Sequence, residues 1–96
     1  QFPKVAKQQA GYQLYRVQQG LMPNDWKPMS GIGSGVFEIR LHDPHEFRVI
    51  YVAKFEEAVY VLHVFQKHSQ KTARSDLELA KTRYADLLKW RKEQSL

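Results

Sequence analysis

Five polar side chains suited to phosphoryl chemistry lie in three short segments that have the composition of strands. They are Glu38 and Arg40 in the first segment, Arg48 in the second, and His63 and Lys67 in the third. Cleavage of RNA without a metal needs a base for the 2′-hydroxyl, cations for the charge growing on the phosphate, and an acid for the leaving oxygen. These residue types can supply all three functions.

The assignment of roles stays open at this level. Glu38 or His63 can act as the base, and His63 or His68 as the acid, while the three cations stabilise negative charge. The alternative for Glu38 is an exposed cross-strand ion pair with Arg40 or Arg48. The alternative for His63 is a hydrogen-bonded histidine of the core.

The net charge of +5, from 15 Lys and Arg against 10 Asp and Glu, is spread unevenly. No acidic residue lies between Ala58 and Ser75, which is the most biased stretch of the chain. A basic surface here predicts contact with the phosphate backbone of a nucleic acid, and the alternative is a solvated loop that happens to be basic. The residues that we expect to bind nucleic acid are His68, Lys71, Arg74 and Arg83.

We expect no metal and no cofactor. The chain has no cysteine, which excludes disulfides, a thiol nucleophile and Cys-based zinc sites. His42 and His45 flank a proline turn without further ligands nearby. The glycines of Gly31–Gly35 precede a strand and lack the Lys-Ser/Thr of a P-loop, so we interpret them as turn residues.

The first element that must position these side chains is a helix. A helix over residues 3–20 is predicted, because apolar residues recur at helical spacing between a proline suited to the first turn and a glycine suited to the end. Its apolar face consists of Ala6, Ala10, Leu14, Val17 and Leu21. Residues 22–35 are rich in Gly and Pro and predict a loop with one short helical turn at most.

Three strands follow, over residues 36–41, 47–54 and 59–67, with a turn at Asp43-Pro44. In the first strand Glu38 and Arg40 lie on the face opposite the apolar residues, so the polar side of the sheet is expected to be a charged surface. The third strand is apolar on both faces and is therefore predicted to be central.

A last helix, running to about Arg91, follows a capping box formed by Ser75 and Glu78. Its expected buried face consists of Leu77, Ala80, Tyr84, Leu87 and Leu88. The order helix, β-meander, helix predicts a single α+β domain over residues 1–96 with an antiparallel sheet. The longest apolar stretch, Ala58–Phe65, is too short to span a bilayer, and we expect a cytoplasmic protein.

Over nearly its whole length the chain resembles the RelE/ParE superfamily of toxin–antitoxin toxins, and more narrowly its HigB-like, phage-associated branch. The segments that carry the resemblance are Gly35–Arg40, Phe47–Val52, Val61–Lys67 and Ala80–Tyr84, together with the opening Ala10–Leu14 and Asp25–Met29. The superfamily normally begins with a strand before the first helix, and this strand is expected to be missing here.

The resemblance implies a small antiparallel sheet with helices on one side and a concave basic face. Arg48 matches the phosphate-stabilising arginine of the family, and Lys67 matches a basic residue that assists the leaving group. Arg40 stands where RelE-type enzymes have a strand lysine. Glu38 stands in place of their other strand lysine, with reversed charge, and the tyrosine that they place shortly after the last strand has no match in residues 73–80.

As function, the resemblance implies a toxin that enters the ribosomal A site and cleaves mRNA, an endoribonuclease that needs no metal. The implied partners are the ribosome, the mRNA and an antitoxin, often of helix-turn-helix type in this branch. Two alternatives stay open: a ParE-like toxin that inhibits DNA gyrase without cleaving anything, and an inactive module that only binds its antitoxin.

Overall fold

The computed structural model describes residues 3–42 and 45–96, and the turn predicted at Asp43-Pro44 lies outside them. The elements are α1 (Lys4–Gln18), β1 (Trp26–Pro28), β2 (Val36–Leu41), β3 (Phe47–Val52), β4 (Tyr60–Gln66) and α2 (Arg74–Glu93). The strands form one antiparallel sheet in the order β1-β2-β3-β4. This arrangement confirms the predicted α+β fold with a helix at each end of the meander.

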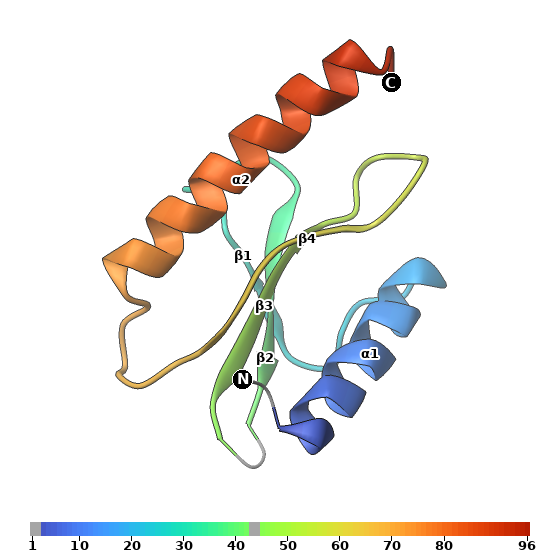
Figure 1. The fold of residues 1–96 in the computed structure, drawn as a ribbon. Coiled ribbons are helices and arrows are strands. Elements are labelled where there is room, and N and C mark those ends of the chain that lie inside the picture. Colours follow the sequence, from blue (N-terminus) through green and yellow to red (C-terminus); the bar gives the residue numbers. More distant parts are fainter. Residues whose placement is uncertain (1–2, 43–44) are drawn as a thin grey trace.

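The two helices cover opposite faces of the sheet (Figure 1). All six residues of β3 are buried, so this strand presents apolar side chains on both faces. Two apolar faces need two covering layers, and one helix supplies each. The expectation of helices on one side of the sheet is therefore wrong.

The predicted inner face of the first helix is confirmed along α1. Ala6 is fully buried, and Ala10, Leu14 and Val17 pack against the same core cluster. Leu21 lies beyond the helix end and is exposed. On the sheet this cluster consists of Ile39, Leu41, Phe47, Val49 and Tyr51.

The segment 22–35 is not only a loop, because β1 lies within it. Trp26 pairs with Ile39 and Pro28 with Phe37, and the Trp26 ring meets the Phe37 ring edge-on at 5.4 Å. Three residues are too few to show a period of two, and a proline is tolerated on an edge strand because its missing N–H can face away from the ladder. The sequence pattern therefore gave no signal for this strand.

The prediction of a central third strand is also wrong, since β4 forms the edge of the sheet next to β3. Leu62 and Phe65 are buried, whereas Val61 and Val64 are 45% and 37% exposed. The apolar run in β4 therefore reflects one buried face and one half-open face. The interior strand that is buried on both faces is β3.

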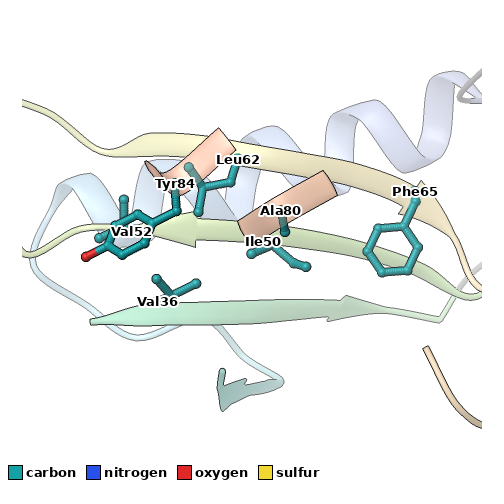
Figure 2. Packing of buried hydrophobic residues seen from close by; sticks show 7 residues of the cluster. All are labelled: Val36, Ile50, Val52, Leu62, Phe65, Ala80 and Tyr84. Carbon is teal, nitrogen blue, oxygen red and sulfur yellow. The ribbon is translucent and has the colours of Figure 1, made fainter. Parts of the chain in front are cut away.

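The second helix packs on the sheet through Ala80 and Tyr84, which lie over Ile50, Val52 and Leu62 (Figure 2). Leu77 and Leu87 are partly buried, but Leu88 is 41% exposed and does not belong to the inner face. The predicted capping box is absent as well: the helix begins at Arg74 after Ala73, and no side chain caps it. Ser75 therefore stands inside the first turn.

Two glycines of the turn before β2 are required by geometry, which supports their interpretation as turn residues. Gly35 has a φ of +77°, a conformation that side chains of L-residues rarely adopt. A Cβ on Gly33 would overlap the ring of Tyr84. The Tyr84 hydroxyl donates a hydrogen bond to the Ser34 carbonyl at 3.2 Å, so this turn is fixed against α2.

Candidate functional site

A buried carboxylate between two guanidinium groups organises the α2 face of the sheet. Glu38 is 1% exposed, and its Oε1 lies 3.6 Å from Arg40 Nε and 3.8 Å from Arg48 Nε. Arg40 and Arg48 are direct partners across β2 and β3. The predicted ion pair is thus present with both arginines, but the expectation that Glu38 lies on an exposed charged surface is wrong.

Hydrogen bonding inside this cluster is incomplete. Among the described residues, Glu38 Oε2, Arg40 Nε and Arg48 Nε have no hydrogen-bond partner. The three groups therefore interact through charge at separations beyond a normal hydrogen bond. Glu38 offsets the charge of two cations and has no contact with solvent from which it could reach a substrate.

Arg48 is fixed at both terminal nitrogens. Its Nη1 donates to the Phe47 carbonyl at 3.0 Å, and its Nη2 donates to Glu46 Oε1 at 2.9 Å. The side chain is 6% exposed. The guanidinium therefore has one orientation, set by neighbours along its own strand and by Glu38 on the adjacent strand.

The end of the sheet brings Arg48 beside the chain that leaves β4. A hollow of about 380 Å³ is lined by Glu46, Arg48, Lys67, His68, Ser69 and Gln70. The Lys67 N–H donates to the Glu46 carbonyl at 2.7 Å, which extends the pairing of β3 and β4 by one residue and fixes Lys67 at this edge. Two cations predicted as site residues thus face one hollow, with a histidine beside them.

The remaining basic residues of the linker lie toward α2. A second, smaller hollow includes Lys67, His68 and Lys71, and it adjoins the first through Lys67, His68 and Ser69. Lys71 is exposed, and Arg74 has a side chain that is 93% exposed, 4.0 Å from Glu78. The predicted nucleic-acid contacts at His68, Lys71 and Arg74 are therefore available to a ligand.

His63 occupies a different place on the same face. Its Nε2–H donates to Asp76 Oδ1 at 2.8 Å, and its ring stacks on Phe65 at 4.9 Å. Arg83 Nη1 lies 3.4 Å from His63 Nδ1 and donates to the Leu62 carbonyl at 3.0 Å. Both residues connect β4 to α2, and neither lines the hollow beside Arg48.

Three residues that the sequence did not single out as a group continue the cluster outward from Arg48. His42 Nδ1 lies 2.8 Å from Glu46 Oε2, and His42 Nε2 lies 2.5 Å from Asp25 Oδ2. They come from the segment before β1, the end of β2 and the start of β3. No spacing in the sequence could connect Asp25 to His42, because only the pairing of β1 with β2 brings them together.

These contacts change the proton affinity of His42 and of Glu46. Hydrogen bonds to Asp25 and then to Glu46 raise the pKa of His42 above its usual range. Hydrogen bonds from His42 and then from Arg48 lower the pKa of Glu46. The geometry therefore favours the imidazolium form of His42 between the two carboxylates.

Chemically, this arrangement can bind a phosphate group. Arg48 is a fixed cation beside an open hollow that Lys67 also lines, and Glu38 lies between Arg48 and Arg40. In the described part of the chain no group of three or more His, Cys, Asp or Glu residues could hold a metal ion. None of the described helices is both long and apolar enough to span a bilayer.

Comparison with known proteins gives one match. A family model described as "Phage derived protein Gp49-like (DUF891)" matches residues 1–85. No curated protein and no solved structure matches the chain. The matched range contains β1 to β4, α1 and the first half of α2, and so includes every residue of the cluster around Arg48.

Proposed function

The chain belongs to the Gp49-like family of phage-derived proteins, and from this premise we propose that it is the toxin of a type II toxin–antitoxin system. The family is associated with toxins of such systems. We propose further that the toxin is an endoribonuclease of the RelE/ParE superfamily, of the HigB-like branch, which cleaves mRNA on translating ribosomes. Its partners would be an antitoxin protein, the ribosome and mRNA, and its place of action the cytoplasm.

The observation that carries this proposal is the hollow shared by Arg48 and Lys67. A phosphodiester in this hollow would meet the fixed guanidinium of Arg48 and the positive charge of Lys67, from β3 and from the residue after β4. Cations aimed at the position where charge develops are the largest single contribution in metal-free phosphoryl chemistry. A hollow of about 380 Å³ has room for a phosphate with its adjoining sugar, while a longer strand would continue over the linker.

The roles follow from the positions of the side chains. Arg48 would bind the non-bridging oxygens of the phosphate, and Lys67 would stabilise the leaving oxygen. His68 lines the same hollow and would supply the proton for that oxygen, while the proton of the attacking 2′-hydroxyl would pass to water, because the hollow is open and neither Glu38 nor His63 lines it. Arg40, which pairs with Arg48 across the strands and has a side chain 33% exposed, would add positive charge outside the hollow.

Glu38 and His63 would act through their neighbours. Glu38 would hold the two arginines in place, because its carboxylate is buried between them. His63 would hold the start of α2 through Asp76, and so the direction in which the basic linker leaves the sheet. Lys71, Arg74 and Arg83 would contact the nucleic-acid backbone beyond the hollow.

Primer extension on mRNA from a cell-free translation reaction tests the proposal. The wild-type protein is expected to produce cuts on translated messages, and Arg48→Ala and Lys67→Ala are expected to reduce the cleavage rate by about a hundredfold each. Arg16→Ala is the matched control, because Arg16 binds the Met22 carbonyl on the far side of the molecule. It should leave the rate unchanged.

Three results would count against the proposal. Intact mRNA with the wild-type protein as well as with its variants would refute the endonuclease. If the same preparation blocks supercoiling by DNA gyrase, the ParE-like alternative is favoured instead. Unchanged cleavage by both Arg48→Ala and Lys67→Ala would show that the reaction occurs elsewhere. Absence of growth arrest on expression would favour a module that only binds its antitoxin.

A further inference from the structure

A chain of polar contacts connects Arg48 to the surface at Asp25. The two carboxylate oxygens of Glu46 contact different residues: Oε1 accepts a hydrogen bond from Arg48 Nη2 at 2.9 Å, and Oε2 lies 2.8 Å from His42 Nδ1. The other ring nitrogen of His42 contacts Asp25 Oδ2 at 2.5 Å. Each contact fixes the next, so the orientation of Glu46 depends on His42.

His42 can make both contacts only as an imidazolium. A neutral imidazole has one N–H donor and one acceptor lone pair, whereas both of its nitrogens here face carboxylate oxygens. Loss of the proton would place a lone pair against either Asp25 or Glu46 and break that contact. The raised pKa of His42 is the expected counterpart of this geometry.

The Arg48 guanidinium has more N–H donors than its contacts use. A guanidinium has five N–H groups. One N–H of Nη1 and one of Nη2 are used by the Phe47 carbonyl and by Glu46. Within the described residues, this leaves a second N–H on each terminal nitrogen for a phosphate, provided that the two existing bonds hold the group in place.

We propose that Asp25, His42 and Glu46 are positioning residues for phosphate binding at Arg48, and that the protonation of His42 determines whether they hold it. The protonated ring fixes Glu46 and offsets its negative charge beside the hollow. The neutral ring loses its contact with either Asp25 or Glu46, and Glu46 then faces an incoming phosphate with a negative charge that His42 no longer offsets. This inference rests on the proposed function only in treating the hollow as a phosphate site.

Other charged groups face these residues and must be separated from them. Arg40 and Tyr12 line the groove beside His42, and Lys67 and His68 line the hollow beside Glu46. Among them, His68 is a second histidine. The measurements are therefore made in a His68→Gln background, and a change in binding between about pH 5 and about pH 9 is assigned to His42 only if His42→Gln abolishes it.

The experiment measures fluorescence anisotropy of a short labelled single-stranded RNA across this pH range, with the full chain. Binding in the parent is expected to weaken about fivefold as pH rises through the pKa of His42, which is typical for the loss of one partly exposed ionic contact. His42→Gln should bind at the weaker level throughout, without a transition. Asp25→Asn should move the midpoint to lower pH, because it removes the first cause of the raised pKa.

The matched control is His45→Gln, at an exposed histidine of the same hairpin. It should keep both the midpoint and the amplitude of the parent. Since His42 has a side chain that is 53% exposed, its replacement is compatible with folding, which circular dichroism can verify.

Three results would overturn the inference, and two of them come from the pH series. In the first, Asp25→Asn leaves the midpoint unmoved; in the second, His42→Gln keeps the pH-dependent loss of binding. If RNA binding follows the His42 titration while ribosomal cleavage is absent, the proposed endonuclease fails and the positioning role stands. If Arg48→Ala leaves RNA binding unchanged at every pH, the phosphate site and its positioning chain are both refuted.

Discussion

Replacing Glu38 by glutamine tests whether the cluster on the α2 face depends on a buried charge. The substitution keeps the shape of the side chain and removes its negative charge. Arg48, which is 5% exposed, then loses one of its two carboxylate partners, and an amide N–H₂ can face the guanidinium groups. A buried cation deprived of a partner is costly because its desolvation is no longer offset.

The size of the effect can be worked out from the two arginines. Breaking a buried ion pair typically costs 3–5 kcal/mol. Arg48 keeps Glu46 at 2.9 Å, and the Arg40 side chain is one-third exposed and can turn to solvent, so the lower end applies. We expect the free energy of unfolding to fall by about 3 kcal/mol, which for a domain of this length lowers Tm by roughly 15 °C.

The assay is urea and thermal unfolding monitored by circular dichroism at neutral pH. Glu56→Gln is the matched control, because Glu56 is exposed, and it should change the free energy of unfolding by less than about 0.5 kcal/mol. A double variant with Arg40→Gln isolates the coupling of that pair. A loss below about 1 kcal/mol for Glu38→Gln would refute the idea that this carboxylate offsets the charge of the buried Arg48 and of Arg40.

Two further predictions concern stability. Gly33→Ala should lower the free energy of unfolding, measured by urea denaturation, by about 2 kcal/mol, since the new Cβ overlaps the Tyr84 ring. Gly31→Ala should not lower it, because its Cβ would meet nothing. Equal effects of the two substitutions would contradict the close packing of Gly33 on Tyr84. Hydrogen bonds from Arg91 hold the pKa of Glu57 at about 2, so the stabilisation from this pair is present above about pH 4.5 and is lost as pH falls toward 2. The Tm difference between wild type and Arg91→Gln should shrink over that window, and a constant difference would contradict the pairing.

Elements with a clear period could be predicted from the sequence, and those without one could not. The helix before residue 20 showed helical spacing, and the three longer strands showed alternation or a run of apolar strand-forming residues, so their positions agree with the structure to within a few residues. Strand β1 has three residues including Pro28, which is too short for any period. The sheet order depends on which edge remains open, and a strand with apolar residues on both sides gives no sign of this, as β4 shows.

For the site, alternation correctly grouped Glu38, Arg40 and Arg48 on one face, since that follows from strand geometry alone. The burial of Glu38 and Arg48 could not be foreseen, because it depends on how other segments cover this face of the sheet. The contact of Asp25 with His42 was invisible for a related reason: it requires the pairing of a strand that the pattern did not reveal. Side-chain chemistry could thus be read within a strand but not between distant segments.

The strands lie in the sheet in the same order as in the chain, so the two walls of the hollow are synthesised at different times. A chain emerging from the ribosome completes β2 and β3, with Arg48 and Glu46, before residues 60–70 have been added. The other wall of the hollow, with Lys67 and His68, becomes available only once β4 has joined the sheet. A nascent chain therefore lacks the shared cationic hollow until the residues up to Gln70 have emerged and β4 has joined the sheet.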